Sequence, residues 1–251
     1  MDILLILFFF LLGLIFGSFF NVVGLRLPEN IPFANDRSIC PHCNHQLSWY
    51  ENIPIISFAI QGAKCRHCRK KISFIYPIIE LSTGILFALS YSLIGLNLEI
   101  ITALLLVSML MIILVSDITF MLIPNRVLLF FLPLFIIIRI AQPLDPWWSS
   151  ILGGIIGITL LALIIIVSRG GMGAGDMKLF GILGIILGID KVLLAFFLSC
   201  MIGAIIGMML LFFKVIDRRQ PVPFGPYIVA ATLITYFYGE RLVNWYFNLF
   251  L

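Results

Sequence analysis

Charged residues are scarce in this sequence. Its 251 residues include 16 lysines and arginines and 12 aspartates and glutamates, and 62% of the residues are hydrophobic. A typical soluble domain has about 25% charged and about 45–50% apolar residues, so a water-soluble globule is excluded. A disordered chain is excluded as well, because disorder requires low hydrophobicity. The composition therefore predicts an all-α protein with many helices in a lipid bilayer.

Apolar runs without charged residues, apart from the single Glu80 in 72–98, predict where the chain crosses the bilayer. A helix needs about 20 apolar residues to cross the hydrocarbon core. Two of the runs, 127–138 and 179–189, are shorter than this and need flanking residues or a locally thinner bilayer. We expect about eight transmembrane helices, with 1–25 as the first, 26–71 as a cytoplasmic loop and 72–251 as a helical core. The eight runs are 3–25, 72–98, 100–116, 127–138, 146–168, 179–189, 192–213 and 220–239.

The basic residues predict the orientation of these spans, because lysine and arginine are enriched in cytoplasmic loops. If residues 26–71 are cytoplasmic, only Arg139, Lys191 and Arg241 lie outside, and both termini lie outside too. The net charge of +4 then needs no nucleic-acid partner. The remaining 13 of the 16 basic residues face the cytoplasm: Arg26, Arg37, Lys64, Arg66, Arg69, Lys70, Lys71, Arg126, Arg169, Lys178, Lys214, Arg218 and Arg219.

Four of the five cysteines lie in the polar loop 26–71. They form two CxxC pairs, Cys40 with Cys43 and Cys65 with Cys68, with 21 residues between the pairs. Four thiolates at this spacing close a tetrahedral zinc site and leave no open coordination position. We therefore expect structural zinc that folds a loop too small to build its own core. His45 could replace one of the cysteines as a ligand.

The predicted spans lack histidine. All three histidines lie in residues 26–71, so an intramembrane Ser–His pair would have no base. The HExxH signature of a metalloprotease is absent as well. Three acids near the predicted cytoplasmic face remain as candidates for intramembrane chemistry: Glu80, Asp117 and Asp176.

Asp117 and Asp176 are the candidate catalytic pair. A carboxylate at the C-terminal end of a helix opposes the helix dipole at a cost of about 0.3–1 kcal/mol, which favours a functional reason for Asp117. Asp117 could also simply mark the end of its helix. Asp176 follows a glycine-rich loop and could instead cap the next helix. If the two aspartates converge, one keeps a proton while the other activates water, and the pair hydrolyses an amide.

These motifs together resemble those of the prepilin peptidases, the type IV leader peptidases of the GxGD class of intramembrane aspartic proteases. The order of the motifs along the chain carries the resemblance, which covers nearly the whole sequence. Phe224-Gly-Pro-Tyr227 has Tyr where Phe is frequent. The matching segments are 17–23, 26–28, the tetracysteine loop with 49–54, 76–80, Asp117 with 123–125, 173–178 and 224–227.

The resemblance implies a function and roles for residues. The substrates would be type IV prepilins or type II secretion pseudopilins in the bacterial inner membrane, cleaved at the cytoplasmic face after a short basic leader. Asp117 and Asp176 would be catalytic, and Gly173 and Gly175 would shape the loop. Lys178 would hold charge near Asp176. Many members also methylate the new N-terminus with S-adenosylmethionine.

Within the resemblance, a different GxGD protease that cuts another class of membrane substrate is an alternative, and two readings of other kinds also stay open on the sequence. A transporter or channel could bind a cation with a glycine-rich broken helix and buried acids, although such sites lie near the bilayer midplane. A zinc-anchored assembly scaffold would explain the cysteines but would leave Asp117 and Asp176 without a role. For Glu80, we hypothesise that it receives the positive charge of the leader or the new amine, and a plain ion pair at the interface is the alternative.

Overall fold

The computed structural model describes residues 2–32, 38–40, 42–43, 45–168, 171–217 and 222–250. Within these ranges the chain is helical, and its extended segments form only two isolated bridges. Arg37, Arg169, Arg218 and Arg219, which entered the orientation argument, lie outside the described residues. The chain divides into two compact units, Met1–Thr119 and Phe120–Leu251. The all-helical fold class expected from the composition is confirmed.

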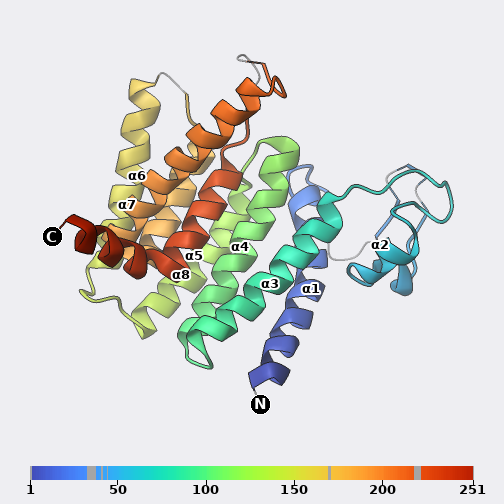
Figure 1. Ribbon diagram of the computed structural model, residues 1–251, viewed down its shortest axis with the longest axis horizontal. Coiled ribbons are helices and arrows are strands. Elements are labelled where there is room, and N and C mark those ends of the chain that lie inside the picture. Colours follow the sequence, from blue (N-terminus) through green and yellow to red (C-terminus); the bar gives the residue numbers. More distant parts are fainter. Residues whose placement is uncertain are drawn as a thin grey trace. The chain divides into compact units, whose positions relative to one another are not determined.

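The first unit contains three long helices, α1 (Asp2–Arg26), α3 (Ile75–Ile94) and α4 (Glu99–Phe120). Helices α1 and α3 pack side by side, and glycines let their backbones approach closely (Figure 1). A Cβ at Gly17 would lie 2.8 Å from the Cα of Glu80. Such small-residue contacts are typical of helices that associate within membranes. The glycine of the Gly17–Val23 motif therefore positions α1 directly against Glu80.

A small insert connects α1 to α3. It contains the short helices η1 (Trp49–Asn52) and α2 (Ile56–Ile60) and two tight hairpins, each marked by an isolated bridge. The bridges join Ile39 to Gln46 and Lys64 to Lys71. Each bridge joins two residues that are seven positions apart in the sequence, and one CxxC pair lies between them.

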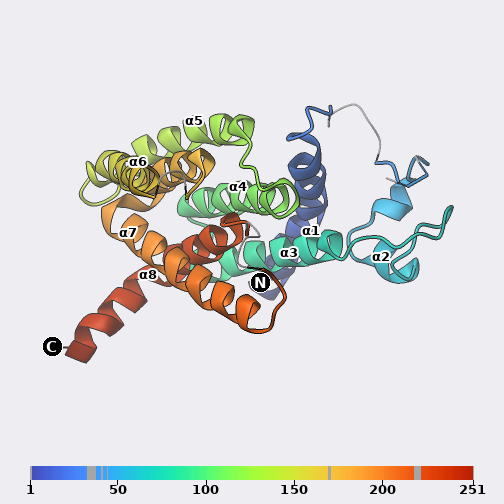
Figure 2. The same cartoon turned by 90° about the horizontal axis from the view of Figure 1, so that it is seen from above.

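The second unit contains α5 (Asn125–Ala141), α6 (Ser149–Val167), α7 (Ala174–Phe212) and α8 (Gly225–Phe250). Helix α7 lies at the centre of this unit, because α5, α6 and α8 all pack against it (Figure 2). Gly153 of α6 and Gly184 of α7 face each other so closely that a Cβ on either would meet the other's backbone. This contact fixes α6 tightly to the first half of α7.

Helix α7 bends at Gly188, and its two halves run in clearly different directions (Figure 2). Gly188 has φ 78° and ψ −177°, a conformation essentially restricted to glycine. Two side chains satisfy the backbone groups that the break frees. Arg139 of α5 donates from Nε and Nη2 to the carbonyl oxygen of Ile186, at 3.1 and 2.7 Å, and the Ser149 hydroxyl accepts the Ile189 N–H at 3.2 Å.

Among the residues that the structure describes, five helices are long and apolar enough to cross a membrane: α1, α3, α4, α6 and α7. Helix α5 has only 17 residues, in line with the short run predicted there. The break at Gly188 separates the predicted runs 179–189 and 192–213. The chain is thus a multi-pass membrane protein, while the count of eight spans stays a prediction, as does the division into 1–25, 26–71 and 72–251.

Candidate active site

Asp176 lies in the first turn of α7. Gly173 occupies the N-cap position, and the Gly173 N–H donates to Oδ2 of Asp176 at 3.2 Å. Asp176 therefore does not cap the helix from the N-cap position, because it is the third helical residue and reaches back. Its side chain is buried, at 8% exposure. The N-terminus of a helix favours negative charge, so this position suits an ionised carboxylate.

The loop before α7 contacts the segment that follows Asp117 in the sequence. A Cβ at Gly175 would lie 3.0 Å from the Cβ of Ile123, so only glycine fits here without displacement. Lys178 donates from Nζ to Oδ1 of Asn125 at 2.9 Å. The structure thus brings the 123–125 and 173–178 motifs together within the second unit. The sequence did not single out Asn125 as the partner of Lys178, because neither residue type implies the other.

Asp117 lies in the last turn of α4, in the first unit. It is 6% exposed and follows Ser116, which is fully buried. The same helix packs against α1, since a Cβ at Gly24 would lie 2.7 Å from the Cβ of Val115. A negative charge here is unfavourable because the side chain is buried and because the C-terminal end of a helix dipole repels it. This cost fits the functional reason for Asp117 inferred from the sequence. The pairing of Asp117 with Asp176 stays a prediction.

Glu80 is buried in α3 and connects the insert to this helix. Its Oε2 accepts the backbone N–H of Ile55 at 2.8 Å. Ile55 has φ 62°, which is unusual for a β-branched residue. The carboxylate therefore holds a strained turn of the insert. This structural role is one that sequence reasoning missed, because the turn lies 25 residues away.

The four cysteines of the insert form one cluster. Their sulfur atoms all lie within 4.8 Å of one another, with Cys40 to Cys68 at 3.9 Å and Cys43 to Cys65 at 4.0 Å. Two thiolates bound at about 2.3 Å to one tetrahedral zinc ion are about 3.8 Å apart. All four are free thiols rather than disulfides. The cluster can therefore hold a metal ion, and its dimensions fit zinc.

The backbone of the hairpins supports thiolates in this cluster. The N–H groups of Cys68 and His67 lower the pKa of the Cys65 thiol to about 7. The Cys43 thiol also accepts a backbone hydrogen bond at His45, yet burial and the neighbouring thiols raise its pKa to about 11. Since zinc binds thiolates, the metal itself must displace the remaining protons. The His45 and His67 rings lie near each other in the insert, with their centroids 4.5 Å apart and their planes tilted by 39°.

Comparison with protein families matches both halves of the chain. The model described as "Bacterial Peptidase A24 N-terminal domain" matches residues 11–94, and the model described as "Type IV leader peptidase family" matches residues 104–208. A curated protein of Bacillus subtilis (strain 168), "Prepilin leader peptidase/N-methyltransferase", is 43% identical over 240 residues, which cover 96% of this chain and 97% of that protein. The chain belongs to the type IV leader peptidase family.

More distant relatives of this leader peptidase family carry the same name. The protein of Aeromonas salmonicida (strain A449) is 30% identical over 269 residues, with 95% of this chain and 92% of that protein covered. The protein of Vibrio cholerae serotype O1 (strain ATCC 39315 / El Tor Inaba N16961) is 33% identical over 250 residues, covering 91% and 95%. No solved structure matches the chain significantly.

The two family models divide the site residues between them. The N-terminal model covers the cysteine cluster and Glu80, and the leader peptidase model covers Asp117 and the whole 173–178 motif. Both predicted aspartates therefore fall within the region that matches the model of the type IV leader peptidase family.

Proposed function

We propose that this chain is a prepilin peptidase. It hydrolyses the peptide bond that follows the basic leader of type IV prepilins or type II secretion pseudopilins. The observation that carries the proposal is the contact of Ile123 and Asn125 with Gly175 and Lys178, which joins the two motifs that resemble those of the leader peptidases. The 43% identical relative, named as a prepilin leader peptidase/N-methyltransferase, supports the same activity.

In this proposal, Asp117 and Asp176 act together on one water molecule. Ile123 follows Asp117 by six residues, so the chain allows at most about 20 Å between them. Since Ile123 contacts Gly175, this short connection along the chain supports the proposed pairing of Asp117 with Asp176. Two carboxyl groups that meet share one proton, because both cannot ionise easily at close range.

The two aspartates have different roles in the proposed reaction. Asp176 is the base, because the α7 N-terminus and the Gly173 N–H stabilise its negative charge. Asp117 carries the proton, because a negative charge at the end of α4 is disfavoured. Asp176 takes a proton from water as the oxygen attacks the peptide carbonyl carbon. The C–N bond then breaks, Asp117 protonates the leaving amine, and the leader departs with a carboxyl group.

The site is proposed to face the cytoplasm, with both chain termini outside. The distribution of 13 of 16 basic residues supports this orientation in the bacterial inner membrane. An apolar helical segment of the substrate would lie in the bilayer, and its basic leader would stay in the cytoplasm. Residues 26–71 would be the cytoplasmic zinc-binding loop, and residues 72–251 would form the catalytic core.

N-methylation of the new N-terminus is proposed as a second activity, with S-adenosylmethionine as the methyl donor. The relatives' printed name supports the methyltransferase activity. The large groove between α5, α6 and α7 is lined mainly by apolar side chains, which do not fit a charged nucleoside donor. No methyl-transfer step is therefore assigned to residues of this chain.

Cleavage of a prepilin peptide by the purified protein tests the proposal. We expect Asp117→Asn and Asp176→Asn each to slow cleavage by about 10²–10⁴-fold, because general acid–base catalysis contributes this much. Asp190→Asn is the matched control, since Asp190 is an exposed acid just beyond the break in α7. Normal cleavage by both site variants would show that the two-aspartate mechanism is wrong.

Glu80 is proposed to receive the leader's positive charge in addition to holding Ile55. Leaders with reversed charge, tested against Glu80→Lys, separate the two roles. Rescue of cleavage by the reversed leader supports charge recognition. Equal loss with both leaders indicates that only the contact with the insert matters.

A further inference from the structure

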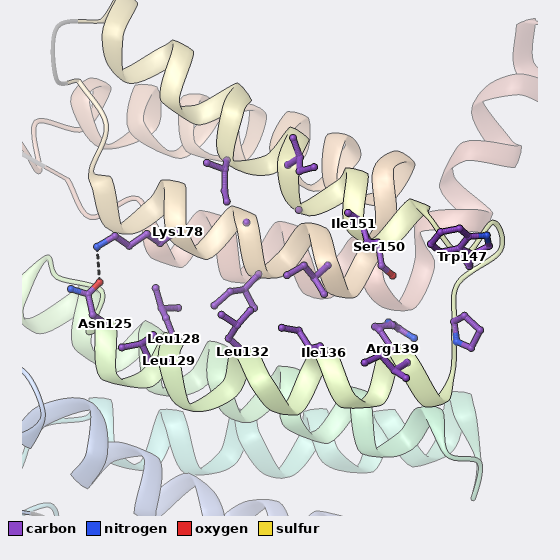
Figure 3. Close-up of a pocket in the computed structure, with 18 residues that line it drawn as sticks. Asn125, Leu128, Leu129, Leu132, Ile136, Arg139, Trp147, Ser150, Ile151 and Lys178 are labelled. Atoms are coloured by element: carbon purple, nitrogen blue, oxygen red, sulfur yellow. Dashed lines mark hydrogen bonds between the residues drawn. The ribbon is translucent and has the colours of Figure 1, made fainter.

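A large apolar groove lies within the second unit. It has a volume of about 1180 Å³ and runs between α5 on one side and α6 and α7 on the other (Figure 3). Helices α5 and α6 both pack against α7 but make little contact with each other, which leaves the space open. Residues on one face of each helix line the groove, for example Leu128, Leu132 and Ile136 of α5.

Polar groups stand only near the two ends of this groove. At one end, Asn125 and Lys178 face each other across it and are joined by a hydrogen bond (Figure 3). At the other end lie Arg139, Trp147 and Ser150. The residues between are aliphatic or glycine. Along the groove, the surface changes from polar to apolar and back to polar, as the layers of a bilayer do. The groove therefore suits a ligand that is apolar over most of the thickness of the membrane.

One end of the groove lies at the same depth as Asp176 of the proposed active site. Asp176 precedes Lys178 by two positions on α7, which is about 3 Å along the helix axis. The Asn125 end of the groove is also part of the motif that contacts the glycine-rich loop. Residues two positions apart project from nearly opposite faces of a helix, so Asp176 itself does not line the groove. A ligand in the groove therefore begins at the depth of Asp176 and reaches its carboxylate around the N-terminal end of α7.

The dimensions of the groove fit an α-helix. Arg139 follows Asn125 by 14 positions on α5, which is about 21 Å at a rise of 1.5 Å per residue. A helix about 10 Å across and about 21 Å long occupies about 1650 Å³. The groove would enclose about two-thirds of such a helix and leave the rest to lipid. Pockets for small molecules are about 300–1000 Å³, so the groove is larger than such a ligand requires.

We propose that this groove, formed by α5, α6 and α7, binds the apolar helical segment of the substrate that follows the scissile peptide bond. This inference rests on the proposed peptidase function. The substrate helix lies along Leu132, Ile136 and Ile155, with its N-terminal end at Lys178 and Asn125. Helix packing in the groove then sets the scissile bond at the depth of Asp176, and the unwound leader extends beyond the end of the groove.

Filling the groove tests the proposal, and adjacent residues of α5 supply a matched pair. Ile136 lines the groove and is 41% exposed, whereas Ile137 is 63% exposed and does not line it. In lipid nanodiscs, with a prepilin-like peptide that has a basic leader and an apolar segment, Ile136→Trp should raise KM at least about tenfold, which corresponds to about 1.4 kcal/mol. Its kcat should stay within about twofold of the wild type, and Ile137→Trp should change neither constant.

Photo-crosslinking gives a second readout that does not depend on cleavage. A benzophenone side chain placed at position 136 should crosslink to the apolar segment of the peptide, and one at position 137 should not. Equal kinetics of the two tryptophan variants, or crosslinks from position 136 to lipid or to a second copy of the chain alone, would overturn the proposal. If the wild-type protein cleaves no prepilin peptide, the proposed function fails, while the crosslinks at position 136 still report whether the groove binds an apolar helix.

Discussion

At the residue scale, Gly175 is the position where the two motifs of the site meet. A Cβ at this position would lie 3.0, 3.5 and 3.6 Å from Cβ, Cγ1 and Cδ1 of Ile123, respectively. The two methyl groups of a valine would add further atoms beside the same side chain. We expect Gly175→Ala to reduce prepilin cleavage modestly. Gly175→Val should reduce it much more, since overpacking costs about 1–3 kcal/mol.

A second-site change separates this contact from a general loss of folding. Ile123→Ala shortens the side chain that opposes Gly175, so the Gly175→Val/Ile123→Ala protein should recover part of the lost activity. Cleavage rates and melting temperatures of the wild type, the two single variants and the double variant give the coupling energy between positions 123 and 175. Full activity of Gly175→Val would mean that the two motifs do not need this close approach.

At the scale of single elements, the break in α7 depends on Gly188. Its φ of 78° and ψ of −177° disfavour any other residue, and a Cβ would lie 2.6 Å from the Ser149 hydroxyl oxygen. We expect Gly188→Ala to destabilise the protein by about 1–3 kcal/mol, the cost of such a backbone conformation. Thermal or denaturant unfolding in detergent measures the change.

Gly207 provides the control for that substitution within the same helix. A Cβ at Gly207 would meet nothing within 4 Å. Gly207→Ala should leave stability unchanged or raise it by up to about 1 kcal/mol, because alanine is the better helix former. Equal effects of the two substitutions would show that the bend does not require glycine.

The sequence predicts the helices of this protein well, and the physical reason is the bilayer. Long apolar runs have one stable form in lipid, so runs such as 3–25 and 100–116 coincide with α1 and α4 within a few residues. The four cysteines were also predictable, because metal geometry constrains the CxxC spacing. The glycine-rich loop with Asp176 was recognised from its local pattern alone.

Contacts between residues far apart in the chain could not be predicted from the sequence. Arg139 reads in the sequence as a basic residue at the end of a span, and the structure shows it buried against the Ile186 carbonyl oxygen, 47 positions away. The link between Glu80 and Ile55 and the groove over α7 are of the same kind. Each depends on how helices pack, and apolar periodicity carries no information on packing when a helix is apolar all round.

At the scale of the whole molecule, the chain combines membrane helices with one metal-dependent insert. The insert lacks a core of its own, so its fold should depend on zinc. We expect about one zinc per chain by elemental analysis. Removal by a chelator, or by Cys40→Ser, should expose residues 45–71 to limited proteolysis while α1 and α3 stay protected.

His45→Ala is the control for the zinc prediction. The four sulfur atoms already form a complete set within 4.8 Å, so the histidine is not required as a ligand. His45→Ala should keep its zinc and its resistance to protease. Loss of zinc in His45→Ala, with zinc retained in Cys40→Ser, would instead favour histidine as a ligand.

The orientation of the whole chain is the remaining prediction, and it follows from charge. Lysine and arginine resist translocation, and 13 of the 16 stand on the side assigned to the cytoplasm. Green fluorescent protein fused after residue 72 or after residue 216 should therefore fluoresce, because it folds in the cytoplasm. Alkaline phosphatase fused after residue 96 or after residue 251 should be active, because it needs an oxidising compartment. Active phosphatase after residue 72 would contradict this orientation, because it would place the cysteine cluster outside the cytoplasm. Disulfides would then replace zinc in the cluster. The acids on the same side of the membrane could not meet a leader that stays in the cytoplasm.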